Sequence, residues 1–302
     1  MTKAASSGPS LRSVDAAIRV LLEGLIDYAG LFPPAGLAMG ECVRKHASNI
    51  HGQDRWMLGR LIVPARQLGE LEAILVDYET RDNWRLSALV GTDAIPDLQE
   101  IDRFNKRQAR NGVVVDTIEL APQSLERVPP SISQSFQVYL EVPGSIPSHD
   151  LERMQRTGIR AKIRTGGLVP EAIPSTQMLA RFLENCNAAG MAFKATAGLH
   201  HPLRSLRPLT YEVTAPVARM HGFLNVFLAA VVAARGASAE EIQELLEFES
   251  GADVRLAPGE LRFGKARASV ETIRSSRRLF AISFGSCSFD EPVADLEGLG
   301  LL

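Results

Sequence analysis

Short apolar runs alternate with longer segments of helical period along most of the chain. Proline or glycine follows many of the runs, which is typical of strand ends. Strands that alternate with helices pair in parallel through right-handed crossovers, and eight such units in about 250 residues suit a (β/α)8 barrel. The pattern therefore predicts a single-domain α/β TIM barrel, with a doubly wound open sheet as the alternative. The predicted strands are Gly24–Leu31, Gly59–Pro64, Arg85–Val90, Gly112–Leu120, Gln137–Val142, Arg160–Thr165, Ala192–Ala197 and Glu260–Phe263.

Two helices carry clear start signals, and a third stands out by its composition. Ser175 precedes a helical stripe, and Ser238 with Glu241 three residues later forms a capping box. Gly222–Ala234 is the most apolar run of the chain. It is shorter than the roughly 20 residues of a membrane span, so it predicts a buried helix.

The chain divides into a short N-terminal segment and one large domain. Residues 1–12 are predicted to form a flexible N-terminus. Residues 13–302 are expected to form the barrel, starting with a helix near Asp15 and ending in a C-terminal tail from Phe284 that packs on it. In a barrel, the stretch Leu199–Ala215 would cover the C-terminal face, where active sites form.

Charge and cysteine content exclude several classes of protein. The 33 Lys+Arg and 35 Asp+Glu residues give a net charge of −2, with no basic field for nucleic acid or for a membrane surface. Three widely spaced cysteines fit a reducing compartment and exclude a disulfide framework. The first ten residues lack the apolar core of a signal peptide. We therefore expect a cytoplasmic protein that acts on a small molecule, either alone or as a homo-oligomer.

Charged residues inside the predicted strands are the most informative feature. Alternation places Glu141 beside Tyr139 on one strand face, and Lys194 beside Thr196 on another. An ionised group under the helices would carry a large desolvation cost, so the charged faces should point into the barrel. The charges expected to converge there are Glu119, Glu141, Lys162, Arg164 and Lys194.

Two lysines and two carboxylates in a partly dry cavity would couple their titrations. Desolvation and a neighbouring cation both lower the pKa of a lysine. A neutral lysine attacks carbonyls and forms a Schiff base. The alternative is a barrel interior in which these charges only satisfy one another.

The run Lys162-Ile-Arg-Thr165-Gly166, followed by Phe193-Lys194-Ala-Thr-Ala-Gly198, resembles the deoxyribose-phosphate aldolase family of class I aldolases. The resemblance implies a lyase in which Lys162 forms the imine and Lys194 lowers its pKa. It further implies that Asp27 ends strand one and that Glu119 takes the place of an Asp in a proton relay. Arg262-Phe263-Gly264 resembles a motif on the family's eighth strand. We expect no cofactor.

Departures from the family pattern indicate a different substrate. Arg164 replaces a small residue, and its guanidinium could bind a carboxylate or phosphate in bidentate fashion. Gly166 and Gly167 could form an anion nest of backbone N–H groups, or a tight turn that needs positive φ. Further expected substrate contacts are Thr165, Thr196, His201 and Tyr28.

Three histidines cluster after the seventh predicted strand. His200 could act as a general acid or base near neutral pH. Alternatively His200, His201 or His221 could bind a metal together with Glu119 or Glu141, as in a metal-dependent lyase or hydrolase. Structural hydrogen bonding is the third interpretation, and a non-catalytic barrel that only binds a ligand remains a further hypothesis for the whole chain.

Cys287 lies in a Ser-Cys-Ser segment of the predicted tail. A reactive thiolate needs a basic group nearby in space, and no such group neighbours Cys287 in the sequence. We therefore expect Cys287 to pack structurally.

Overall fold

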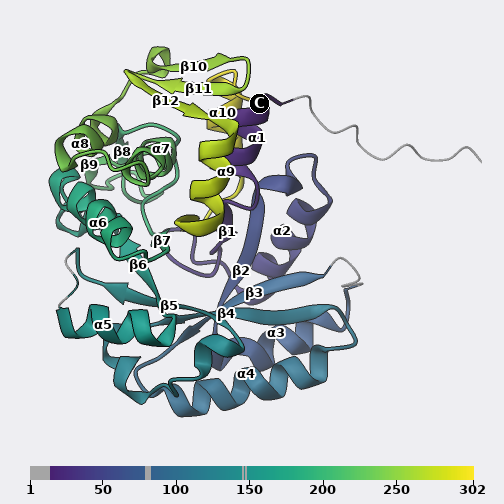
Figure 1. Cartoon of the computed structure of the whole chain (residues 1–302). Coiled ribbons are helices and arrows are strands. Elements are labelled where there is room, and N and C mark those ends of the chain that lie inside the picture. Colours follow the sequence, from purple (N-terminus) through teal and green to yellow (C-terminus); the bar gives the residue numbers. More distant parts are fainter. Residues whose placement is uncertain (1–13, 79–82, 145, 147) are drawn as a thin grey trace, which may run out of the picture.

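Eight parallel strands close into a barrel in the computed structural model, which describes residues 14–78, 83–144, 146 and 148–302 (Figure 1). Their order around the barrel is β1-β13-β7-β6-β5-β4-β3-β2. The TIM barrel prediction is confirmed, and closure excludes the open sheet. The predicted flexible N-terminus, residues 1–12, lies outside the described residues. The barrel strands are β1 (Ile26–Tyr28), β2 (Leu58–Pro64), β3 (Trp84–Val90), β4 (Val113–Leu120), β5 (Gln137–Val142), β6 (Arg160–Arg164), β7 (Phe193–Thr196) and β13 (Ala281–Ser286).

The eighth barrel strand is not the one predicted. Glu260–Phe263 is β11, which pairs antiparallel with β10 (Val254–Ala257) and β12 (Ala266–Ser269) in a separate sheet. Barrel closure comes instead from β13, which pairs with β1 and β7. The expected tail thus begins inside a barrel strand, and the Arg262-Phe263-Gly264 match lies off the barrel. Both segments are short strands, and their pairing partners show which of them belongs to the barrel.

Helices surround the barrel (Figure 1). Asp15 accepts a hydrogen bond from the first turn of α1, Ser175 does the same for α6, and Ser238 with Glu241 forms the predicted capping box of α8. The β4–β5 connection contains only short 3-10 turns. The α-helices are α1 (Ala16–Leu22), α2 (Met39–His51), α3 (Leu68–Leu75), α4 (Ala94–Gln108), α5 (Ser148–Thr157), α6 (Thr176–Ala188), α7 (Phe223–Ala233), α8 (Ala239–Glu247), α9 (Val270–Leu279) and α10 (Asp290–Gly298).

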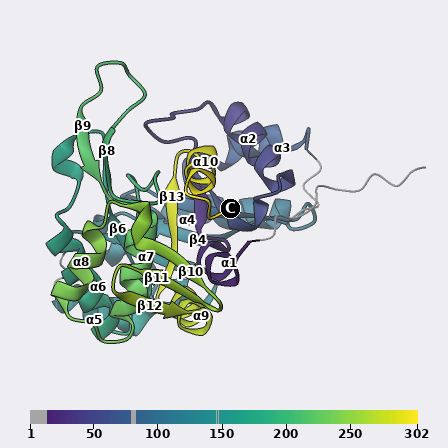
Figure 2. The same ribbon diagram turned by 90° about the horizontal axis from the view of Figure 1, so that it is seen from above.

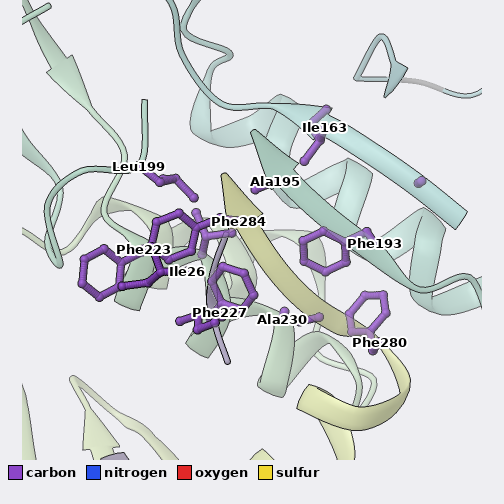
Figure 3. Close-up of a cluster of buried hydrophobic side chains, with 14 of the residues drawn as sticks. Ile26, Ile163, Phe193, Ala195, Leu199, Phe223, Phe227, Ala230, Phe280 and Phe284 are labelled. Atoms are coloured by element: carbon purple, nitrogen blue, oxygen red, sulfur yellow. The ribbon is translucent and has the colours of Figure 1, made fainter. Parts of the chain in front are cut away.

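The core lies between the strands and this helical layer. Figure 3 shows phenylalanines of α7 packed against β7 and β13. The rings of Phe223 and Phe284 stack at 5.2 Å, and Phe193 meets Phe280 edge to face at 5.1 Å. Nearly all of α7 is buried, as its apolar sequence predicts. No helix among the described residues is long and apolar enough to span a membrane.

A β-hairpin follows β7 and stands over one end of the barrel. It consists of β8 (Ser205–Pro208) and β9 (Val217–Met220), and it projects away from the body of the molecule (Figure 2). Leu209, which follows β8, and Met220, which ends β9, line a cavity over the barrel. The prediction that the stretch after β7 covers the C-terminal face is therefore confirmed.

Candidate functional site

The strand register brings the predicted charges into one network. Glu141 of β5 pairs in register with Lys162 of β6, and Lys162 pairs with Lys194 of β7. Glu119 of β4, the strand next to β5, and Asp27 of β1 reach the same region, so their carboxylates meet the two ammonium groups. The convergence predicted from strand alternation is present, near the carboxyl ends of the strands.

Lys194 is enclosed at the base of this network. Its Nζ lies 2.7 Å from Asp27 Oδ2 and 2.6 Å from Glu119 Oε1, and all three side chains are 1% exposed. Burial alone would lower the pKa of Lys194, but attraction to Asp27 and Glu119 outweighs burial and holds the pKa above its usual value. Desolvation therefore acts on Lys194 in the predicted direction, but the two carboxylates compensate its charge and the net pKa is raised.

Two serines and one backbone amide hold the carboxylates in place. Ser87 Oγ donates to Glu119 Oε1 at 2.7 Å, and Ser283 Oγ donates to Asp27 Oδ2 at 2.7 Å. The backbone N–H of Arg60 donates to Asp27 Oδ1. Burial would raise the pKa of Glu119, but the two lysines and Ser87 hold the pKa of Glu119 far below its usual value. Glu119 is therefore a fixed negative charge at neutral pH.

Lys162 occupies the upper part of the network. Its Nζ lies 3.0 Å from Glu119 Oε2 and 2.9 Å from Glu141 Oε2. Unlike Lys194, Lys162 lines a cavity of about 320 Å³, and so do Glu119 and Glu141. The Glu119 carboxylate bridges the two lysines, so Lys162 has a carboxylate on each side and an open space in front of it.

Side chains from several barrel loops enclose the cavity. Apolar walls come from the loop after β1, from β2 and β3, and from the hairpin after β7, while the polar groups come from the strand ends. Besides Lys162, Glu119 and Glu141, the wall includes Phe32, Pro33, Pro34, Ile62, Leu89, Arg164, Gly167, Leu168, Thr196, Gly198, His200, Leu209, Met220, Gly285 and Cys287. An apolar pocket with a few convergent polar groups is typical of a small-molecule site.

Arg164 and Thr196 lie in the cavity wall, as predicted. Arg164 is half exposed and contacts Glu141 Oε1 through Nε at 3.1 Å. Burial would raise the pKa of Glu141, but Lys162 and Arg164 together lower it. A cation at the mouth of the cavity can attract an anionic part of a ligand.

The two predicted glycines have different environments. Gly167 lines the cavity, but neither Gly166 nor Gly167 has positive φ, so the tight-turn interpretation is wrong. A Cβ on Gly166 would lie 2.7 Å from the Cα of Gly198, so Gly166 is needed for close backbone approach. Thr165 is fully buried, and its hydroxyl donates to the carbonyl of Ala197 at 2.5 Å. The hydroxyl thereby ties the end of β6 to the loop after β7.

Tyr28 faces away from the network. Successive strand residues point to opposite sides, and Asp27 takes the inward position of β1. Tyr28 is 1% exposed and stacks on His46 with ring centroids 6.1 Å apart. It lines a smaller neighbouring cavity, and not the one in front of Lys162.

The three histidines have different surroundings and different hydrogen-bond partners. His200 lines the cavity, whereas His201 Nδ1 lies 2.6 Å from Asp295 Oδ2. His221 Nε2 lies 2.8 Å from the carbonyl oxygen of Pro174. Across the described ranges, no group of three or more histidine, cysteine or acidic side chains is arranged to hold a metal ion. The metal-ligand set considered from the sequence is therefore not assembled in this part of the chain.

Sequence reasoning missed several residues of the site. Ser87 and Ser283 are small polar residues at inward strand positions, and alternation could have identified Ser87. Ser283 lies in β13, which the sequence pattern does not identify as the eighth barrel strand. Cys287, expected to pack structurally, lies in the cavity wall beside His200. Glu291 contacts His200 from α10, and no local signal indicates that contact.

Comparisons of the chain with protein-family models, with curated proteins and with solved structures find no match. The interpretation of function accordingly rests on the geometry of the barrel and its cavity.

Proposed function

We propose that the chain is a class I aldolase-like lyase, in which Lys162 forms a Schiff base with a small carbonyl substrate. The observation that carries the proposal is the position of Lys162. It is the lysine of the network that borders the cavity, and two carboxylates lie within 3.0 Å of its Nζ. A buried amine beside a proton acceptor and an open pocket has what imine formation requires.

Glu141 is the proposed proton acceptor for Lys162. Its side chain is 25% exposed, whereas that of Glu119 is 1% exposed. Transfer of a proton from Lys162 to Glu141 leaves an amine that adds to the substrate carbonyl. The resulting carbinolamine loses its hydroxyl as water by taking up a proton, and Glu141 can return that proton.

The iminium ion then withdraws electrons from the carbon–carbon bond that breaks. A base removes the proton of the substrate's hydroxyl group, the new carbonyl product leaves, and the enamine takes up a proton before hydrolysis releases Lys162. Glu119 stays ionised and stabilises the positive charge of the iminium. Lys194 and Asp27 act as positioning residues, because they fix the Glu119 carboxylate without bordering the cavity.

The position of Arg164 favours an anionic substrate. It is a half-exposed cation in the wall of the same cavity as Lys162. A carboxylate or phosphate bound there would lie at the mouth, and its carbonyl carbon would face the interior. We therefore propose a keto acid or a phosphorylated carbonyl compound as the substrate class.

Reductive trapping tests the proposal. The protein is treated with borohydride and one compound at a time from a panel of small aldehydes, ketones and keto acids, then peptide-mapped by mass spectrometry. We expect a reduced adduct on Lys162 with at least one compound. Lys106, which is 74% exposed on α4, serves as the control for non-selective reaction. Labelling of Lys162 no stronger than that of Lys106 with every compound would contradict the proposal.

A further inference from the structure

A cysteine, a histidine and a glutamate form a chain beside the cavity. Cys287 follows β13, and its Sγ lies 3.9 Å from Nε2 and 4.0 Å from Nδ1 of His200. The same Nδ1 of His200 lies 3.0 Å from Glu291 Oε2. The imidazole thus lies against both the thiol and the carboxylate, and these are the residue types of a nucleophile, its base and the group that orients the base. Such contacts are often longer before a substrate binds than during the reaction.

This group shares a cavity with Lys162. Both Cys287 and His200 line the cavity that Lys162 borders, and Cys287 is 6% exposed. A compound bound in the cavity can therefore reach the thiol.

The surroundings of His200 favour the imidazolium, which is the form that remains after His200 takes the proton of the thiol. Burial alone would lower the pKa of His200, but its contacts with Cys287 and Glu291 raise the pKa to about 9. An imidazolium beside a thiol stabilises the thiolate. Burial raises the pKa of Cys42 to about 11 and that of Cys186 to about 12.

We propose that Cys287 is a nucleophilic thiol, with His200 as its base and Glu291 as the orienting carboxylate. Its target is the aldehyde carbon of a compound in the cavity. The sulfur forms a bond to that carbon while the carbonyl π bond breaks. The thiol proton passes through His200 to the carbonyl oxygen, which gives a thiohemiacetal. The addition is reversible and needs neither oxidant nor reductant.

This inference deepens the proposed function without depending on imine formation. In an aldol cleavage the Schiff base holds one carbonyl fragment, and the other fragment leaves as an aldehyde. Cys287 would hold this second fragment. Because the thiol adds to the aldehyde directly, the reaction can be measured in a chain that lacks Lys162.

Alkylation by iodoacetamide tests whether the thiol is activated. Peptide mapping follows the rate at each cysteine between pH 5.5 and 9, with Cys42 and Cys186 as controls in the same chain. An ordinary thiol is only about 1% thiolate at pH 6.5, whereas a thiolate–imidazolium pair is mostly ionised. At pH 6.5, we expect Cys287 to react faster than Cys42 and Cys186. The substitution His200→Gln should slow the alkylation of Cys287 by about 10- to 100-fold. The titratable groups around the sulfur are His200, Glu291, Tyr211, Tyr28, Asp290 and Lys45.

Protection by glycolaldehyde tests the carbonyl chemistry. In a Lys162→Met chain, we expect glycolaldehyde to slow the alkylation of Cys287 in a concentration-dependent manner that dilution reverses. Ethylene glycol has the same carbon count but no carbonyl, and it should give no protection.

Three results would overturn the inference. The first is a Cys287 rate that rises with pH like that of a free thiol in the unaltered chain. This measurement needs no variant, so it stands even where His200→Gln does not fold. The second is a folded His200→Gln chain with an unchanged rate at pH 6.5. The third is equal protection by glycolaldehyde and ethylene glycol. Failure of borohydride trapping on Lys162 with a positive alkylation result would refute the proposed Schiff base alone.

Discussion

Replacing Lys194 by methionine tests whether the buried ion-pair network governs both stability and its pH dependence. The substitution keeps most of the side-chain volume and removes the charge. Lys194 Nζ lies 2.7 Å from Asp27 Oδ2 and 2.6 Å from Glu119 Oε1. After the change, the buried Asp27 carboxylate loses the ammonium that pairs with it, and the buried Glu119 carboxylate keeps its contact with Lys162. Removing one partner of a buried pair costs about 3–5 kcal/mol, so we expect a loss of that size at pH 7.

The sign of the pH effect follows from the carboxylates. In the unaltered chain the pKa of Glu119 lies below its usual 4.5, so its contribution to stability is complete above pH 4.5 and is lost as the pH falls through the folded pKa. In Lys194→Met, the uncompensated carboxylates bind a proton more readily in the folded than in the unfolded state. Stability then falls as the pH rises, by up to about 1.4 kcal/mol per pH unit for each extra proton bound.

Urea unfolding at pH 5 and pH 7, followed by circular dichroism, measures both effects. Lys106→Met is the matched control, because Lys106 Nζ also lies 2.6 Å from a carboxylate, that of Asp102, but on an exposed helix surface. The control should change the free energy of unfolding by less than about 1 kcal/mol. The reasoning is refuted if Lys194→Met costs no more than this control. It is also refuted if the cost is the same at pH 5 and pH 7.

Two further substitutions test local features of the fold. Burial lowers the pKa of His46 from 6.5 to about 3. On acidification, the unfolded state therefore binds the proton at a higher pH than the folded state. The free energy of unfolding should fall by about 3 kcal/mol between pH 7 and pH 4. His46→Phe retains a ring against Tyr28, and urea titrations should show a shallower acid dependence; an unchanged slope would refute the assignment. Gly198→Ala places a methyl group 2.7 Å from the Cα of Gly166 at φ +77°, and we expect a loss of about 2–4 kcal/mol in thermal or urea unfolding. Gly236→Ala is the control at φ +82° with open space around it, and it should cost about 1 kcal/mol; equal losses would exclude the contact as the cause.

The sequence alone was enough to predict the fold class and the charged centre of the site. Alternation within β5, β6 and β7 placed Glu141, Lys162 and Lys194 on inward faces, because an ionised side chain is too costly to bury under the helices. Serine caps and the capping box marked helix starts correctly, since these signals act within three or four residues.

The sequence did not predict which distant segments pair with one another in the barrel. Both β11 and β13 are short strands, and β13 is the barrel strand because it fits between β1 and β7. For the same reason, the sequence predicts a tail from Phe284, which in the structure lies within the barrel strand that leads to Cys287.

The tertiary structure decided which way each side chain points and which groups it contacts. Thr165 and Tyr28 are polar residues next to site residues, yet one bonds to a backbone carbonyl and the other stacks on His46. Cys287 and His200 are 87 residues apart in the chain and meet only after the barrel closes. The sequence by itself determined which chemistry-bearing residues lie in strands, because strand period and burial cost are local. Which of them face one cavity was decided only by closure of the barrel, because that depends on the register of eight strands at once.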